Sequence, residues 1–206
     1  MQKLVIATKN AGKLREMRDM LSHLSVEVVS LADFSELPDA VEDASTFAGN
    51  ARIKAQFYAD AVGFPCLADD SGIEVAALAG APGVHSARYA GEHGNDAANN
   101  EKMVRELKKL GMAESPADYR CAMVFAIPGV KHAKALTEGR VDGRVVLTPR
   151  GKGGFGYDPY FIPKDYPEKH MAELTQAEKE AISHRGRALR LMLEKLEAYY
   201  ASRNHQ

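Results

Sequence analysis

Three things that the sequence has little of limit its possible functions. It has two cysteines, Cys66 and Cys121, which lie in separate apolar runs and form no motif, so we expect two buried, reduced thiols on strands. Its formal net charge is −1, which argues against a whole surface built to bind nucleic acid. The apolar run at the N-terminus is too short for a signal sequence or a membrane span, so we expect a cytoplasmic protein without a membrane partner.

The rest of the composition is that of an ordinary globular protein. Of the 206 residues, 45% are hydrophobic and 27% are charged. This length is enough for one full hydrophobic core, although length alone would also permit two small domains. Because the chain has neither internal repeats nor a linker, we predict a single domain over residues 1–206.

Apolar patterns and turn residues predict an α/β chain. Strands are predicted over residues 4–7, 26–29, 65–68 and 119–127, with a hairpin return over 73–78 and paired strands over 136–147. Helices are predicted over residues 12–24 and 46–62, before Gly111, and from a capping box at Thr175 to Ser183, where a further helix starts toward Tyr200. Since helices do not regularly separate the strands, we expect a mixed sheet.

The first strand–helix turn is a candidate anion site. A helix N-terminus attracts anions through its free N–H groups and its dipole, Gly12 permits close approach, and Lys13 adds a positive charge. The spacing of a Walker loop is missing, and a plain turn capped by Asn10 is the alternative. The candidate residues are Thr8, Lys9, Asn10, Ala11, Gly12 and Lys13.

An acidic pair, Asp69-Asp70, follows the third predicted strand. Adjacent carboxylates at a buried strand end repel each other, and Mg²⁺ between them would relieve this repulsion. The alternative is a surface turn, because Asp-Ser-Gly is common in turns. Glu42 lies in another acidic loop that could supply a carboxylate. Lys54 lies on one helix face with Asn50, where it either contacts a ligand or is solvated.

A glycine-rich loop over residues 151–159 carries aromatic side chains. Phe155 and Tyr157 could stack on a nucleobase, and Asp158 could accept hydrogen bonds from a base or ribose or organise the loop; a tight hairpin with an aromatic plug is the alternative. Near the predicted start of the last helix, His184 and Arg185 could donate to a carbonyl oxygen or a phosphate, or lie on a solvated helix face.

Taken in order, these motifs resemble the inosine/xanthosine triphosphate pyrophosphatase family, the house-cleaning nucleotide hydrolases. The resemblance runs from Lys3 to about Leu193. It is carried by Ala7-Thr8-x-Asn10-x-x-Lys13 with Glu16, Thr46-Phe47-x-x-Asn50-Ala51-x-x-Lys54-Ala55, Ala68-Asp69-Asp70-Ser71-Gly72, Gly80-Ala81-Pro82-Gly83, Ser86-Ala87-Arg88-Tyr89, Gly153-Gly154-Phe155-Gly156-Tyr157-Asp158-Pro159, Ala172-Glu173-Leu174 with Lys179, and Ser183-His184-Arg185-Gly186.

The resemblance implies a fold and an activity. The fold is α/β, with an elongated mixed β-sheet flanked by helices and two lobes around a central active-site cleft. The activity is Mg²⁺-dependent hydrolysis of the triphosphates ITP, dITP and XTP to the nucleoside monophosphate and pyrophosphate, which keeps these nucleotides out of DNA and RNA. The implied partners are the purine nucleoside triphosphate and a second copy of the chain in a homodimer, with no nucleic acid.

The resemblance also implies roles for individual residues. Residues 8–13 resemble the triphosphate-binding loop, and Lys54 and Ser71 resemble phosphate contacts. Asp70 resembles the general base. The residues that resemble the metal site are Glu42, Asp69 and Asp70. Those that resemble the base and ribose platform are Phe155, Gly156, Tyr157 and Asp158. Those that resemble the residues recognising the nucleotide are Lys179, His184 and Arg185, with His184 and Arg185 near its 6-oxo group.

The chain departs from the family pattern around its acidic residues. Lys9 stands where the family often has glycine. Glu42-Asp43-Ala44 replaces the common Glu-Thr-Gly, and Gly49 stands where a glutamate commonly precedes the helix asparagine, so a carboxylate is lost and Asp43 is its candidate replacement. Two other functions compete with this one: a pyrophosphatase for modified pyrimidine triphosphates on a related fold, and a noncatalytic nucleotide- or RNA-binding module, which would need no acidic pair.

Overall fold

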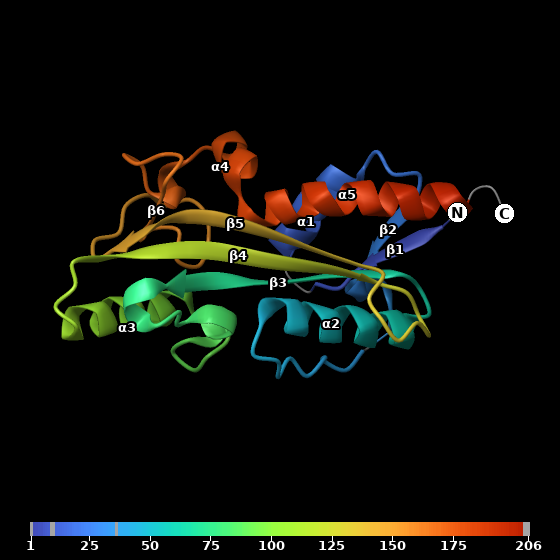
Figure 1. The fold of residues 1–206 in the computed structure, drawn as a ribbon, viewed down its shortest axis with the longest axis horizontal. Helices are drawn as coiled ribbons and strands as arrows, with labels where there is room; N and C mark the ends of the chain where they lie inside the picture. Colours follow the sequence, from blue (N-terminus) through green and yellow to red (C-terminus); the bar gives the residue numbers. More distant parts are fainter. Residues whose placement is uncertain (1, 9–10, 36, 204–206) are drawn as a thin grey trace. The chain divides into compact units, whose positions relative to one another are not determined.

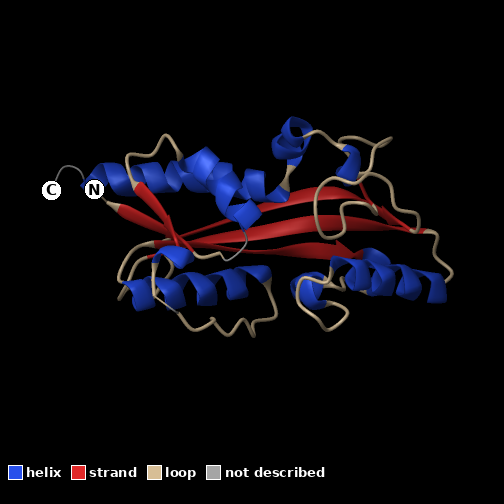
Figure 2. Cartoon of the chain, turned by 180° about the vertical axis from the view of Figure 1, so that it is seen from behind, coloured by secondary structure: helices blue, strands red, loops and turns tan. Residues whose placement is uncertain are grey.

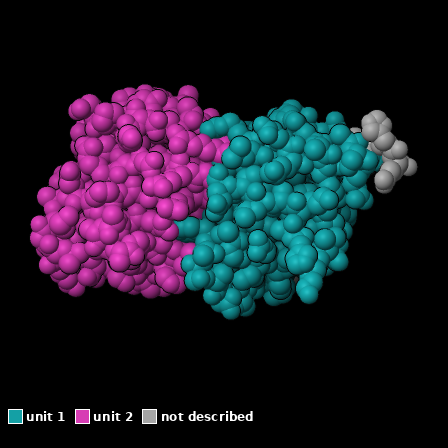
Figure 3. All heavy atoms as spheres, in the orientation of Figure 1, with its two compact units in different colours: residues 1–70, 122–138, 188–206 teal, residues 71–121, 139–187 magenta. Residues whose placement is uncertain are grey.

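The computed structural model describes residues 2–8, 11–35 and 37–203. It divides into two compact units, each assembled from separate stretches of the chain (Figure 3). Unit 1 comprises Met1–Asp70, Ala122–Glu138 and Ala188–Gln206, and unit 2 comprises Ser71–Cys121 and Gly139–Arg187. The single domain and the central cleft expected from the sequence stay predictions.

The strands form a mixed sheet in the order β2-β1-β3-β4-β5-β6. β1 pairs in parallel with both β2 and β3, and β5 pairs antiparallel with β6, so the predicted mixed sheet is confirmed. Lys3 lies opposite Glu27, Val5 opposite Cys66 and Gly143 opposite Pro163. The strands are β1 (Lys3–Ile6), β2 (Glu27–Ser30), β3 (Cys66–Val75), β4 (Glu114–Ala126), β5 (Ala135–Val146) and β6 (Phe161–Pro163).

In unit 1, helices cover both faces of the strands. Helix α1 (Ala11–Leu21) and most of α5 (His184–Arg203) lie on one face, and α2 (Phe47–Val62) lies on the other (Figures 1 and 2). The small residues of α2 pack inward, so that Ala51 and Ala55 are fully buried. Thr46 caps the N-terminus of α2, because its side chain accepts a hydrogen bond from the Gly49 N–H. A short 3₁₀ helix, Leu31–Asp33, follows β2.

In unit 2, helix α3 (Asp96–Lys109) and helix α4 (Gln176–Ile182) lie on opposite faces of the strands (Figure 1). The core between them includes Ile73, Met103 and Phe161. The capping box predicted at Thr175 is confirmed, since Thr175 and Glu178 each accept a hydrogen bond from the other's backbone N–H. The 3₁₀ helices of this unit are Ala76–Leu78, Gly83–Arg88 and Met171–Glu173.

Two strand predictions were wrong, for the same reason. β3 does not end at Ala68 or return as a hairpin but continues through the acidic pair to Val75. β5 is one strand rather than a pair. A side chain at Gly143 would collide with the Ile162 carbonyl of β6, so this glycine permits close strand approach and makes no turn. In both places, residues typical of turns are held in an extended backbone by contacts from other elements.

The two cysteines agree with the prediction made for them. Cys66 lies on β3 and Cys121 on β4, and both thiols are buried. Burial raises the pKa of Cys66, so its sulfur stays protonated. Among the helices of residues 2–8, 11–35 and 37–203, none combines the length and the apolar character needed to cross a membrane.

Candidate active site

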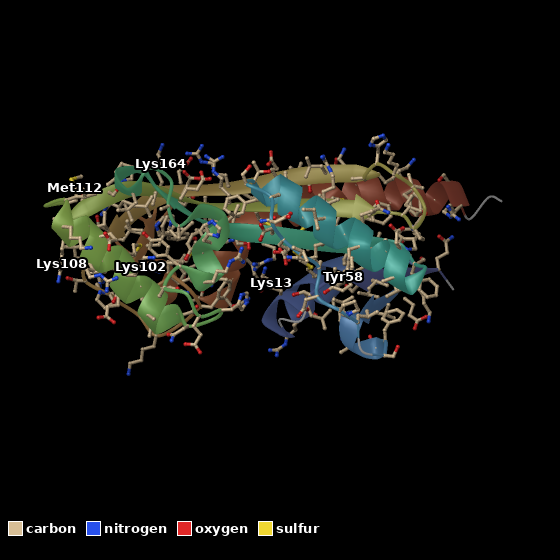
Figure 4. The ribbon with its side chains drawn as sticks, turned by 90° about the horizontal axis from the view of Figure 1, so that it is seen from below. Lys13, Tyr58, Lys102, Lys108, Met112 and Lys164 are labelled. Carbon is tan, nitrogen blue, oxygen red and sulfur yellow. The ribbon has the colours of Figure 1, made fainter. Side chains whose placement is uncertain are left out.

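The acidic pair lies in the middle of β3, and its two side chains point to opposite faces of the sheet because strand side chains alternate. Asp69 is 3% exposed and its Oδ2 is 2.9 Å from Nζ of Lys13, on the first turn of α1 (Figure 4). Asp70 accepts a hydrogen bond of 3.1 Å from the side-chain amide of Asn50 on α2. The expected repulsion is therefore reduced by separation and by different partners, although the charge of Asp69 still contributes to raising the pKa of Asp70.

Lys54 connects this strand to the acidic loop before α2. Its ammonium donates to the backbone carbonyl of Asp69 at 3.0 Å and lies 2.8 Å from Oε2 of Glu42. Burial by itself would lower the pKa of Lys54, but the negative charges of Asp69 and Glu42 outweigh it, and the pKa is raised. Lys54 is therefore a cation held among carboxylates, which does not fit the alternative of a solvated helix face.

Asp70 has the electrostatic properties of a base. Burial raises the pKa of its carboxyl group above the usual value, while the charge of Lys54 and the hydrogen bond from Asn50 partly oppose the rise. The charge of Glu42 also reaches Asp70 and raises its pKa. A carboxylate with a raised pKa accepts a proton more readily than an exposed one, as a general base must.

The donor atoms near Asp70 suit a hard cation. Glu42, Asp69 and Asp70 offer only carboxylate oxygens, which are ligands that Mg²⁺ prefers. Within the described part of the chain, no three acidic, histidine or cysteine side chains converge closely enough to hold an ion by themselves. The divergence of Asp69 and Asp70 explains this, and Mg²⁺ commonly completes its shell from substrate phosphates and water. The residues therefore fit a metal bound together with a substrate.

The first turn is described only in part. Lys9 and Asn10, which the sequence assigned to phosphate binding, lie outside the described residues. Thr8 lies two residues after the end of β1, and its N–H donates to the carbonyl of Ile6 at 2.9 Å. Helix α1 begins at Ala11 and continues through Gly12, so its N-terminus directly follows this turn, as an anion site at a helix start requires.

The glycine-rich loop presents one of its two aromatic rings to solvent. Phe155 is 50% exposed, whereas Tyr157 is buried and donates a hydrogen bond of 2.9 Å to the Ser86 carbonyl. The Lys179 ammonium lies 4.5 Å from the centre of the Phe155 ring, and the Arg185 guanidinium lies 5.7 Å from it. Phe155 therefore offers a flat surface with two cations close to its ring, and Tyr157 anchors the loop in the core.

Asp158 organises this loop from within. Its carboxylate is buried and accepts hydrogen bonds from the Phe155 N–H at 3.0 Å, the Lys179 ammonium at 2.5 Å and the Tyr119 hydroxyl at 3.1 Å. Because these donors all belong to the protein, the geometry favours the loop-organising role over direct contact with a nucleotide.

His184 and Arg185 are fixed where one helix stops and the next begins. As predicted, the chain breaks at Ser183, whose hydroxyl oxygen accepts the Gly186 N–H at 2.9 Å. Both side chains are buried, with Arg185 only 2% exposed. His184 stacks on the ring of Tyr119, and Arg185 donates to the Ser71 hydroxyl at 3.4 Å. The adjacent donors are therefore held firmly, unlike residues of a solvated helix face.

Three residues near this loop were not found from the sequence. Asp96 accepts the Gly156 N–H at 2.7 Å, and the side-chain amide of Asn100 donates to the Gly156 carbonyl at 2.8 Å. The start of α3 therefore holds both the backbone N–H and the backbone carbonyl of Gly156. Their spacing of four on a polar helix was the only local signal. Tyr119 looked like an ordinary strand residue, because its partners are distant in sequence.

Comparison with known proteins agrees with this arrangement. Residues 4–195 match the model of the Ham1 family. The chain is 51% identical to the dITP/XTP pyrophosphatase of Geobacillus kaustophilus, over 92% of this chain and 91% of that protein, and 46% identical to that of Bacillus subtilis, over 96% and 98%. A solved HAM1 protein from Coxiella burnetii is 39% identical, with a TM-score of 0.87 over 95% of this chain and 98% of that one. The chain therefore belongs to the Ham1 family.

Proposed function

We propose that the chain hydrolyses nonstandard purine nucleoside triphosphates, namely ITP, dITP and XTP, to the nucleoside monophosphate and pyrophosphate. The observation that carries this proposal is the half-buried carboxylate of Asp70, held by Asn50 beside the cationic Lys54. A base with a raised pKa and adjacent cations suits attack on a phosphoanhydride, whose negative charge must be offset. The activity named for the relatives from Geobacillus and Bacillus supports the same reaction.

The triphosphate is assigned to the first turn and the cations near β3. Lys13 and Lys54 each already lie against a carboxyl or carbonyl oxygen of Asp69, so their charges are positioned before a substrate arrives. The N–H groups at the start of α1 and the Ser71 hydroxyl supply uncharged donors. Residues 8–12 complete this assignment: Thr8, Lys9, Asn10, Ala11 and Gly12.

Asp70 is assigned the proton transfer. Its carboxylate would take a proton from the water that attacks near the α-phosphorus, and pyrophosphate would leave. Glu42 and Asp70 would hold Mg²⁺ together with phosphate oxygens, and Asp69, which points to the opposite face of the sheet, would support the site through its ion pair with Lys13. A bound Mg²⁺ supplies charge neutralisation on the phosphates.

The base is assigned to the loop and the start of α5. Phe155 would stack on the purine, Lys179 would contact the nucleotide beside it, and His184 and Arg185 would donate to the 6-oxo group. Adenine carries a 6-amino donor at this position, so buried donors would face another donor and lose their partner. Gly156, Tyr157 and Asp158 keep the loop in shape.

The biological setting follows from this chemistry. Removal of such triphosphates keeps them out of DNA and RNA. A homodimer and a cytoplasmic location belong to the same proposal, and the resemblance to the family implies the dimer.

A substrate panel tests the proposal directly. The purified protein with Mg²⁺ is given ITP, XTP, dITP, GTP, ATP and dUTP, and pyrophosphate and orthophosphate are measured separately. We expect pyrophosphate from ITP, XTP and dITP, with ATP the poorer substrate. Release of orthophosphate alone would refute the proposal. A preference for dUTP would favour a pyrimidine enzyme, and binding without turnover would favour a noncatalytic module.

The pH dependence of turnover should respond to Asn50. Activity needs ionised Asp70, so turnover falls as pH drops through the pKa of that carboxyl. The Asn50 hydrogen bond lowers this pKa, and Asn50→Ala removes it, so the acid limb of the kcat/KM profile for ITP should move to higher pH. Gln56→Ala, on the same helix but paired with Asp60, is the control and should leave the limb in place. An unmoved limb in Asn50→Ala would contradict the assignment of that limb to Asp70.

A further inference from the structure

Tyr119 on β4 contacts two parts of the site that are far apart in sequence. Its side chain is buried, and its hydroxyl lies 3.1 Å from Oδ1 of Asp158. Its ring stacks on the imidazole of His184, with ring centres 4.9 Å apart and planes inclined by 8°. The same ring makes an edge-type contact with the ring of Phe161, with ring centres 4.8 Å apart and planes inclined by 68°. One side chain therefore touches both the loop and the start of α5.

The hydroxyl of Tyr119 acts on the loop through Asp158. Oδ2 of Asp158 accepts the Phe155 N–H and the Lys179 ammonium, while Oδ1 accepts Tyr119. Loss of the hydroxyl would leave a buried carboxylate oxygen without this donor, and the carboxylate could then rotate. Because the same carboxylate holds the backbone of Phe155, such a rotation would displace the exposed ring.

The ring of Tyr119 acts on His184. A parallel stack over a buried imidazole sets the plane of that ring, and with it the direction in which its nitrogens can donate. Burial, and then the charge of Asp158, keeps the pKa of Tyr119 well above its ordinary value, so its hydroxyl keeps its proton across the physiological range.

We propose that Tyr119 is a positioning residue for purine recognition, whose hydroxyl holds the Asp158–Phe155 platform and whose ring orients His184. The inference rests on the proposed function and deepens it. It separates two effects: the hydroxyl governs how well any purine stacks, and the ring governs how well the 6-oxo group is distinguished from a 6-amino group.

Two substitutions separate these effects. Tyr119→Phe keeps the stack and loses the hydroxyl, so KM should rise roughly tenfold for ITP and ATP alike, with kcat and the ITP-to-ATP ratio of kcat/KM within about twofold of wild type. Tyr119→Leu loses both, so the ITP-to-ATP ratio should also fall by about tenfold or more. A general loss of folding would instead lower kcat for both nucleotides and leave this pattern absent.

Tyr200→Phe is the matched control. Tyr200 is also a buried tyrosine, and its hydroxyl donates to the Lys3 carbonyl at 3.2 Å. Removal of the Tyr200 hydroxyl should lower the melting temperature about as much as Tyr119→Phe does, without changing KM. An unchanged KM in Tyr119→Phe, or an unchanged ITP-to-ATP ratio in Tyr119→Leu, overturns the inference.

A spectroscopic measurement separates this inference from the proposed function. The imidazole proton signals of His184, assigned with His184→Gln, should carry an upfield ring-current shift in wild type and Tyr119→Phe, and lose it in Tyr119→Leu. If wild type shows no preference for ITP, the proposed function fails, and these signals still report whether Tyr119 orients His184. If wild type prefers ITP and the signals are the same in all three proteins, the positioning role is wrong.

Discussion

Asp70→Asn is expected to bind ITP as well as wild type and to lose turnover by roughly 10²–10⁴-fold. The amide has the shape of the carboxylate and can still accept the hydrogen bond from Asn50, but it cannot take a proton from water. Binding should persist because the variant removes a negative charge close to the triphosphate, which offsets the weaker hold of a neutral amide oxygen on Mg²⁺. Single-turnover pyrophosphate release and calorimetric titration with ITP measure the two properties separately.

Protein stability separates loss of the base from loss of the fold. The folded-state pKa of Asp70 is raised, so stability falls as pH rises from the ordinary pKa of a carboxyl group toward this raised pKa, and the full cost is present at neutral pH. A neutral asparagine removes this cost, and the melting temperature at neutral pH should be equal to or higher than that of wild type. Asp60→Asn, a surface carboxylate on the same helix as Asn50, should keep full turnover. Near-normal turnover in Asp70→Asn would rule out Asp70 as the base.

Arg185→Met is expected to remove most of the discrimination between ITP and ATP. The guanidinium is almost fully buried, so a purine that carries a donor in place of the 6-oxo acceptor would set two donors against each other at this position. Sites built on such donors can reject a mismatched ligand by ~10⁴-fold. Methionine has a similar length and no donor, so kcat/KM for ITP should fall roughly 10²-fold or more while that for ATP changes little.

Arg187→Met provides the matched control for this substitution. Arg187 lies two residues further along α5, where it donates to the Arg140 carbonyl at 2.6 Å and contacts Asp165 near the surface. Its loss should leave the ITP-to-ATP ratio unchanged. Equal losses for ITP and ATP in Arg185→Met would assign Arg185 to phosphate or ribose rather than to the 6-oxo group.

The sequence determined the elements whose signals are local. Local apolar patterns were enough to predict β1 and β2 and the three longest helices, α2, α3 and α5. The capping box at Thr175 and the break at Ser183 depend only on neighbouring side chains. The ordered motifs were enough to indicate the family, because each motif keeps its residues close together in the chain. The predicted strand boundaries were wrong where turn-forming residues are held in an extended backbone, as at Asp69 and Gly143.

Only the tertiary structure decided how the candidate site works. Asp69 and Asp70 are neighbours in sequence, yet strand alternation gives them different partners, Lys13 and Asn50, which lie 56 and 20 residues away. The raised pKa of Asp70 depends on burial, which no local pattern encodes. The contacts of Tyr119 with Asp158 and His184 likewise join residues distant in the chain. Local patterns predict backbone conformation, but the electrostatics of a site depend on which distant side chains the folded sheet brings together.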